Sequence, residues 1–289
     1  MTTNLFERAS DFIWRNARLI ERRRFAFHFL DGQKSSVLAA LRPYQNPDGG
    51  FGNALEPDSR CPDSTPLAVM TAFYILDELD AFDDPMELRA CDYLETITTG
   101  DGGIPFTLPV INNYPHTPWM GTDDPNPPAS INPTADIAGL LLKHKIQHPW
   151  LEKAVPFCWQ AQDPGRDGFH DILPAVQFLT NSPDAERAAP ILQAIKDTIL
   201  QENLVIFDRN TEGYVKFPLD WAPAPQHIFR SLFSDEQIET DLQALISAQQ
   251  DEGGWPINWP PVSTASECEW RGVKTLENLL ILKHYGKMS

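Results

Sequence analysis

The chain has 289 residues, and its 23 lysines and arginines against 40 aspartates and glutamates give a formal net charge of −17. This acidic balance argues against nucleic acid as a partner, because binding to phosphates needs a basic face. With 42% hydrophobic and 22% charged residues, the composition is typical of a folded chain and not of a disordered one. The 26 prolines and 16 glycines are unusual beside segments with helical periodicity.

The sequence carries no sign of export or of membrane insertion. Its four cysteines lie far apart without a CxxC pair, so we expect reduced thiols. The first 16 residues mix acidic and basic side chains where a signal peptide would have an apolar segment. No apolar stretch approaches the roughly 20 residues of a membrane-spanning helix. We therefore expect a cytoplasmic protein without an integral membrane segment.

Four segments repeat one pattern, in which a helix is followed by a turn with Asp and Gly and then by an apolar or aromatic residue. Asp and Gly tolerate the positive φ that a chain needs to leave a helix abruptly, and paired glycines let two backbones approach closely. The predicted helices cover residues 36–45, 88–98, 154–162 and 241–250. Their turns cover residues 46–51, 100–104, 167–169 and 251–255.

A second type of helix follows the turns. Thr65-Pro66 and Asn132-Pro133 each resemble an N-cap followed by proline at the first helical position. They open strongly apolar helices predicted at 67–79 and 134–144. The helix before the last turn instead has a single apolar stripe, and Ser234 with Gln237 predicts a capping box at its start. Alternating polar-faced and apolar helices predict an outer and an inner layer.

These repeats resemble those of a known superfamily. Segment 242–255, with Gln249-Gln250 before Gly253-Gly254-Trp255, resembles the Gln/Trp-type repeats of squalene-hopene cyclases and the related repeats of protein prenyltransferase β subunits. Segments 38–51 and 93–106 resemble them as well. The resemblance implies an all-α fold, a single (α/α)6-type toroid of the terpenoid cyclase and protein prenyltransferase superfamily. It implies one domain over residues 1–289, with N-terminal helices in 1–31 packing on the ring.

The reactions of that superfamily lack their signatures in this sequence. The chain has no Asp-x-Asp-Asp, the acid of class II cyclases. Asp123-Asp124 does not continue as the Asp-Asp-x-x-Asp that holds Mg²⁺ on a diphosphate. No Asp-x-Cys with a suitable later His offers zinc ligands. The repeat therefore indicates the fold and not the reaction, and neither Mg²⁺ nor Zn²⁺ is supported by a motif.

Candidate site residues are acidic and aromatic side chains near the predicted starts of the inner helices, where helix dipoles favour anions. The candidate acid/base groups are Glu56, Asp58, His170, Asp171 and Glu269. The candidate substrate-binding residues are Trp119, Asp220, Trp221, Trp255, Trp259, Trp270 and Arg271. The alternatives are structural: the tryptophans pack between helices, Asp171 caps a helix, and Glu269 pairs with Arg271 at a helix start.

Residues 100–132 form the longest stretch without helical periodicity and contain seven prolines. Loops of more than about 12–15 residues are usually functional or disordered. Because Tyr114, His116 and Trp119 offer anchors, we expect a lid over a cavity.

The expected function is that of a cyclase-like or prenyltransferase-like protein that binds an isoprenoid or other apolar small molecule in a central cavity, with carboxylates as acid and base. Two alternatives remain open. One is a non-catalytic toroid that binds a peptide or protein partner. The other is a carbohydrate-active α/α-barrel enzyme, whose paired carboxylates would flank a glycosidic bond.

Overall fold

The computed structural model describes residues 2–163, 165 and 168–288. Helices dominate these residues, and the only strands among them are β1 (Ile104–Pro105) and β2 (Ala129–Ser130), which pair antiparallel. The expected all-α class is therefore confirmed. The chain forms two compact units, which we call the central unit (Leu41–Thr198) and the terminal unit (Met1–Ala40 with Ile199–Ser289).

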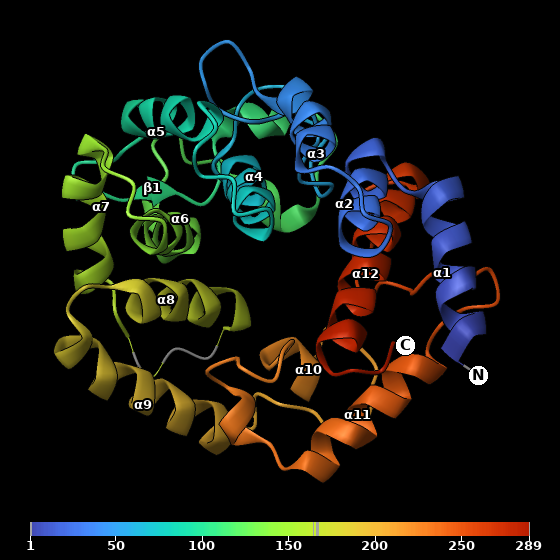
Figure 1. Cartoon of the computed structure of the whole chain (residues 1–289). Coiled ribbons are helices and arrows are strands. Elements are labelled where there is room, and N and C mark those ends of the chain that lie inside the picture. Colours follow the sequence, from blue (N-terminus) through green and yellow to red (C-terminus); the bar gives the residue numbers. More distant parts are fainter. Residues whose placement is uncertain (1, 164, 166–167, 289) are drawn as a thin grey trace. The chain divides into compact units, whose positions relative to one another are not determined.

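The helices of the central unit lie in two rows (Figure 1). The chain alternates between the rows, because each apolar helix is followed by a polar-faced one. The apolar row contains α4 (Pro66–Glu78), α6 (Ile131–Lys143) and α8 (Phe169–Asn181). The polar-faced row contains α5 (Met86–Thr96), α7 (Pro149–Gln160) and α9 (Ala185–Gln201), and the 3-10 helix η1 (Arg42–Tyr44) precedes the first turn.

Helix α6 is the centre of the apolar row, where it packs most extensively against α8 and also contacts α4 and α7. Gly139 permits the approach to α8, since a Cβ at this position would lie 2.6 Å from the carbonyl oxygen of Gln177. Most side chains of α6 are consequently buried, which explains why its sequence is apolar on nearly all sides.

The predicted starts of the two apolar helices have different outcomes. Thr65 caps α4 by accepting a hydrogen bond from the Ala68 amide, with Pro66 at the first position, as expected. Asn132 does keep an extended backbone (φ −97°, ψ 117°). Its Oδ1, however, is buried and accepts no hydrogen bond from any described residue, so the predicted capping role of Asn132 is wrong.

The terminal unit is built around α12 (Thr264–His284), which packs against α1 (Thr2–Asn16) and α2 (Leu19–Phe29) (Figure 1). Gly272 allows this packing, because a Cβ there would lie 2.8 Å from the Ala17 Cβ. The other helices of the unit, in chain order, are α3 (Lys34–Leu41), α10 (Pro218–Trp221) and α11 (Asp235–Ser247), with the 3-10 helix η4 (Arg230–Leu232). The capping box predicted for α11 from Ser234 and Gln237 is confirmed.

Three of the four predicted turns share one backbone geometry. They cover residues 46–50, 99–103 and 250–254. In each, the amide of the first residue donates to the carbonyl oxygen four residues later, at 2.8–2.9 Å. Its own carbonyl accepts from the amide of the first residue of the Gly-Gly pair at 2.9–3.0 Å. That glycine has a φ of 93°, 96° or 98°, in the left-handed region that side chains disfavour, at Gly49, Gly102 and Gly253 respectively.

The same glycine touches the backbone of a polar-faced helix in all three turns. A Cβ on Gly49 would lie 2.2 Å from the carbonyl oxygen of Arg89 in α5. The corresponding distances are 2.5 Å from Gly102 to Lys153 in α7, and 2.1 Å from Gly253 to Arg8 in α1. Any side chain would prevent this approach, so each turn docks on a basic position of a helix.

An aromatic ring lies four residues beyond each of these basic positions. It faces the second glycine of the turn, where a Cβ would come within 2.8 Å of the ring. Each docked helix therefore presents the same pair of positions to its turn. The pairs are Arg89 with Tyr93, Lys153 with Phe157, and Arg8 with Phe12.

The residue directly before each turn adds a further contact between the turn and the helix on which it packs. Gln45 donates through Nε2 to the carbonyl oxygens of Gly49 (2.8 Å) and Met86 (2.9 Å). Gln249 does the same with Gly253 (2.9 Å) and Leu5 (3.0 Å). In the second turn Thr98 takes this place and accepts a hydrogen bond from the indole of Trp150, 3.1 Å away.

The predicted turn at residues 167–169 is different. Asp167 lies outside the described residues, and Gly168, with a φ of −87°, is the N-cap of α8. The docking geometry of the other three turns is therefore not found at Gly168.

The close approach at Gly253 makes a stability prediction. Gly253→Ala should lower the free energy of unfolding by at least about 2 kcal/mol, because it adds a clash with the Arg8 carbonyl to an unfavourable φ. Gly213→Ala is the matched control, since Gly213 has a φ of 99° but open space around it. It should cost only about 1 kcal/mol. Urea unfolding of both variants measures the difference, and equal losses would contradict the docking account.

Candidate functional site

A group of aromatic and charged side chains gathers on one face of α12 in the terminal unit. Trp270, Lys274 and Glu277 share that face because they are spaced by four and three residues. Interactions of their aromatic rings and charges connect them to residues of α10 and of the loops before α10 and α12. We call the whole group the α12 cluster, and its seven members are Tyr214, Lys216, Asp220, Trp259, Trp270, Lys274 and Glu277.

The aromatic part of the cluster is a row of three rings. Trp259 lies edge-on to Tyr214, with a centroid distance of 6.0 Å, and edge-on to Trp270 at 5.2 Å. Tyr214 is 48% exposed, so the row reaches solvent. The indole nitrogen of Trp259 is buried and has no hydrogen-bond partner among the described residues. A buried donor without an acceptor is unfavourable, so a bound acceptor at this position would be stabilised.

The charged part contains two lysines with different surroundings. The Lys274 ammonium lies 2.8 Å from the Glu277 carboxylate. Burial lowers the pKa of Lys274, but Glu277 and Asp220 together outweigh it and raise that pKa. Lys216 instead donates to the Tyr214 hydroxyl at 2.8 Å and lies 4.1 Å from the centroid of the Tyr214 ring.

Burial lowers the pKa of Lys216 to about 8, and the nearby Lys274 acts in the same direction. Asp220 and Glu277 oppose this shift without cancelling it. With this pKa about half of the Lys216 amine is neutral near pH 8, and most of it is charged at pH 7. The cluster combines an apolar wall with a polar end at which proton transfer is accessible near physiological pH.

The structure places three predicted substrate-binding residues, Asp220, Trp259 and Trp270, in this cluster. Two others lie in the core of the terminal unit, where Trp221 is 1% and Trp255 is 2% exposed. The Trp255 indole donates to the Leu245 carbonyl at 2.8 Å, which satisfies its only polar group.

Arg271 ties α12 to the last turn. It pairs with Glu252, donates through Nε to the Trp255 carbonyl at 3.3 Å, and lies 5.0 Å from the centroid of the Phe12 ring. The predicted location of Glu269 and Arg271 at a helix start is wrong, because both lie inside α12. Its capping box at Ser263 sets the start six residues before Glu269.

Three predicted residues of the central unit come together: Glu56, Asp58 and Trp119. Asp58 is 7% exposed and accepts a hydrogen bond from the Trp119 indole at 3.1 Å. Its amide donates to Glu56 at 2.9 Å, and its carbonyl accepts from the Thr117 amide at 2.9 Å. These contacts fasten the 100–132 segment to the loop that follows the first turn.

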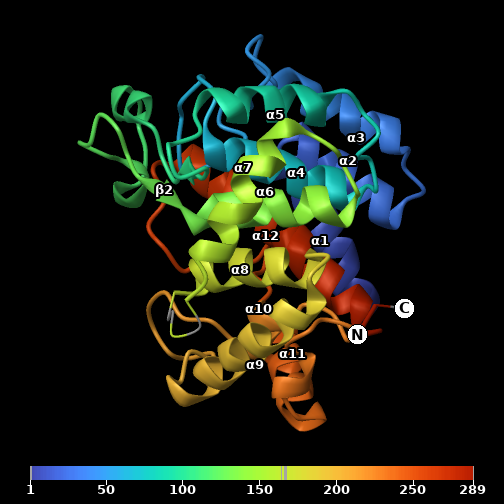
Figure 2. The same ribbon diagram turned by 90° about the vertical axis from the view of Figure 1, so that its left-hand side faces the viewer.

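The 100–132 segment contains more regular structure than expected. It holds β1, η2 (Pro109–Asn113), η3 (Pro118–Met120) and β2. Between the strands the chain extends away from the helices of the central unit (Figure 2). Its anchor is a small apolar cluster formed by Cys61, Leu67, Ile111 and Met120. The predicted lid function stays a prediction.

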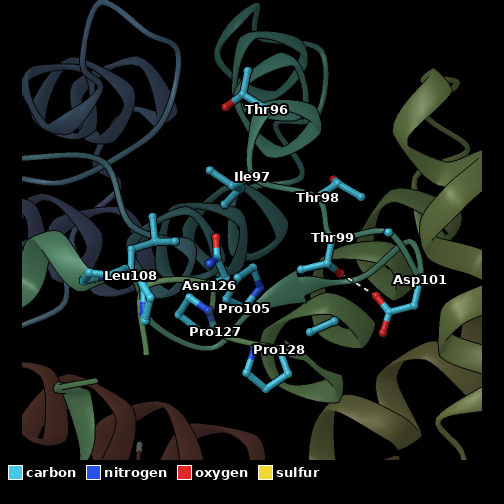
Figure 3. Close-up of a pocket in the computed structure, with 14 residues that line it drawn as sticks. Thr96, Ile97, Thr98, Thr99, Asp101, Pro105, Leu108, Asn126, Pro127 and Pro128 are labelled. Carbon is cyan, nitrogen blue, oxygen red and sulfur yellow. Dashed lines mark hydrogen bonds between the residues drawn. The ribbon is translucent and has the colours of Figure 1, made fainter. Parts of the chain in front are cut away.

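An open pocket of about 650 Å³ lies between the second turn and this segment (Figure 3). Prolines and threonines provide most of its lining, together with Asn126 and Asp101. Thr99 donates a hydrogen bond to the Asp101 carboxylate. The Asp101 side chain is therefore part of the hydrogen-bonding of the turn. None of the predicted site residues lines this pocket.

His170 and Asp171 lie in the first turn of α8. His170 is exposed and packs edge-on against the Phe169 ring at 5.4 Å. The N-cap of the helix is Gly168, so the alternative in which Asp171 is the cap is wrong.

Sequence reasoning missed a buried carboxyl group in α6 that contacts Tyr74 of α4. Asp136 is 3% exposed and accepts a hydrogen bond from the hydroxyl of Tyr74. Burial raises the pKa of Asp136 to about 7, while the Tyr74 hydrogen bond acts in the opposite direction. The available signal was a single carboxylate within the apolar run of α6.

Two features are absent from the described residues. No group of three or more His, Cys, Asp or Glu side chains converges there in a way that could hold a metal ion. In the same part of the chain, every helix is too short or too polar to cross a membrane.

Comparison with known proteins supports the fold. No family model matches the chain, and no curated protein matches its sequence. A crystal structure of a protein from Actinoplanes is similar, with a TM-score of 0.57 and 17% sequence identity. The match covers 99% of this chain and 100% of the other, so the chain shares its fold with a solved structure over almost its whole length.

The raised pKa of Asp136 predicts that the stability of the fold depends on pH. In the unfolded chain this carboxyl ionises near pH 4, whereas in the folded chain it ionises near pH 7. Stability should therefore fall as pH rises from about 4 to 7, by at most about 4 kcal/mol from this group. Asp136→Asn cannot ionise, so its stability relative to the wild type should increase over that interval and level off above it.

Chemical unfolding at several pH values tests this. Tyr74→Phe is the companion variant, and it should move the midpoint of the fall to higher pH because it removes the hydrogen bond that favours the carboxylate. A difference between wild type and Asp136→Asn that does not change with pH would contradict the prediction.

Proposed function

We propose that the chain is a single α/α toroid of the terpenoid cyclase and protein prenyltransferase type, which binds an apolar small molecule at the α12 cluster. The repeated contact supports the toroid, because each of the three Gly-Gly turns packs against a helix that lies far from it in the sequence. The last turn supports it further. It docks on α1, the first helix of the chain, and so joins segments far apart in the sequence.

The α12 cluster supports the binding of an apolar ligand with a polar end. The three rings of Tyr214, Trp259 and Trp270 offer an apolar wall. The single observation that carries the proposal is the buried indole nitrogen of Trp259, which has no acceptor among the described residues. An isoprenoid with an oxygen function could pack its chain on the rings and accept this hydrogen bond.

The charged residues suit the polar end of such a ligand. Lys216 and Lys274 provide donors, and Asp220 and Glu277 provide carboxylates for proton transfer. In this proposal the acid/base role moves from Glu56 and Asp58, which fasten a loop, to the carboxylates of the cluster.

A thermal-shift and tryptophan-fluorescence screen tests the proposal. The compounds tested are a prenyl alcohol, a prenyl diphosphate and an oligosaccharide, each with and without Mg²⁺ or Zn²⁺. We expect an isoprenoid to raise Tm, and Trp259→Phe to weaken its binding at least tenfold, which is about 1.4 kcal/mol. Trp14→Phe, on α1 outside the cluster, is the matched control and should bind normally.

Two outcomes would contradict the proposal. One is the absence of a shift with every isoprenoid. The other is equal affinity of the two tryptophan variants. A shift with the oligosaccharide alone would favour a carbohydrate-binding site instead.

A further inference from the structure

The third residue of each Gly-Gly turn carries a carboxylate, and the partners of this carboxylate differ among the three turns. Asp48, in the first turn, accepts hydrogen bonds from the Gly50 amide at 2.9 Å and from the Ser64 hydroxyl at 2.7 Å. Ser64 directly precedes the N-cap of α4. Glu252, in the last turn, pairs with Arg271 of α12. In both turns a side chain from the segment that follows the turn therefore supplies a donor to the carboxylate.

Asp101 is the corresponding residue of the second turn, and in the described part of the chain it has no donor from the segment that follows. Its one donor there is the hydroxyl of Thr99, which belongs to the turn itself. That hydroxyl also lies 2.9 Å from the Gly103 carbonyl oxygen, and its single hydrogen cannot fully serve both acceptors. Because a carboxylate can accept about four hydrogen bonds, Asp101 keeps acceptor capacity for a ligand.

Asp101 lines the open pocket of about 650 Å³, a volume within the roughly 300–1,000 Å³ that is typical of small-molecule sites. Figure 3 shows Asp101 at one end of the pocket and Leu108 at the other, with Pro105, Pro127 and Pro128 between them. The pocket therefore offers an apolar wall of proline rings that ends at a carboxylate.

The charges at the pocket select the sign of a ligand. Asp101 is the only ionisable side chain among the described residues that line it, so no Lys, Arg or His is available there for an anion. The whole chain has a formal net charge of −17, which attracts cations and repels anions. An ammonium group that donates to Asp101 would gain a charge-assisted hydrogen bond, which is stronger than one between neutral groups.

We propose that this pocket binds a small organic ammonium ion, whose charged group donates to Asp101 and whose apolar body packs on the proline rings. The ammonium supplies the donor that Ser64 and Arg271 supply to the corresponding carboxylates of the other two turns. The pocket shares no residue with the α12 cluster, so this inference does not rest on the proposed function.

Three compounds with the same six-membered ring test the charge selectivity. Cyclohexylmethylamine, cyclohexylmethanol and cyclohexanecarboxylate present an ammonium, a hydroxyl and a carboxylate at pH 7. Each compound is titrated into the ¹⁵N-labelled full chain, and the amide chemical shifts give both the affinity and the location of binding. We expect the amine to bind at least about fivefold more tightly than the alcohol, and the carboxylate not to bind. The shifts should lie at residues 96–101 and 125–129.

Two matched variants identify the charge that binds the amine. Asp101→Asn keeps an acceptor for the Thr99 hydroxyl but removes the charge, so it should weaken amine binding at least about fivefold and leave alcohol binding unchanged. Asp48→Asn makes the same change at the corresponding position of the first turn, outside the pocket, and should leave amine binding unchanged. The comparison of the three compounds on the wild-type protein needs no variant, so it holds even if a substitution prevents folding.

Three outcomes would overturn the inference. They are equal affinities for the amine and the alcohol, amine binding that Asp101→Asn does not weaken, and the absence of amine-induced shifts at the residues that line the pocket. The amide shifts of these residues report on the pocket, whereas the isoprenoid screen reports on the α12 cluster. Failure of one proposal is therefore distinguished from failure of the other.

Discussion

The approach of a turn glycine to the carbonyl of a polar-faced helix is the contact on which the rest of the structure depends. With a hypothetical Cβ only 2.1–2.5 Å from the carbonyl oxygen, no other residue fits. The contact fixes the rotation of the helix against the turn and also its position along its axis, because the second glycine must meet the aromatic ring one turn further on. Gln45 and Gln249 strengthen the contact, because each also donates a hydrogen bond to a backbone carbonyl of the helix on which its turn packs. A short repeated sequence thus sets the geometry between successive helices.

The orientation of the candidate site depends on the last of these turns. Glu252 in the turn pairs with Arg271 of α12, and the Trp255 amide donates to the Thr275 hydroxyl of the same helix at 3.2 Å. The turn thereby holds α12 from two points, and the face that carries Trp270 and Lys274 is oriented as a result. Residues that hold the last turn, Arg271 and Thr275, therefore alternate along α12 with Trp270 and Lys274 of the candidate site.

The Gly-Gly turns could be predicted from the sequence, whereas much of the candidate site could not. Gly-Gly pairs after amphipathic helices have one physical reading, but the partner of each turn is distant in sequence, and α1 as partner of Gly253 is not deducible from spacing. Trp255 and Trp259 look alike in the sequence, and only the tertiary packing places the first in the core and the second in the partly exposed α12 cluster. Lys216 was missed because its properties come from burial and from Lys274, a residue 58 positions away. Burial and the charges of distant residues are consequences of the tertiary fold.

The docking of the last turn on α1 is tested most directly by a double-mutant cycle between Arg8 and Gln249, whose side chains are joined by a hydrogen bond of 2.6 Å. Arg8→Met, Gln249→Ala and the double variant are compared with the wild type in urea unfolding. We predict a coupling free energy of about 1 kcal/mol or more, as expected for a part-buried hydrogen bond to a charged group. Additive effects, with a coupling below roughly 0.3 kcal/mol, would show that α1 does not hold the turn and would contradict the account.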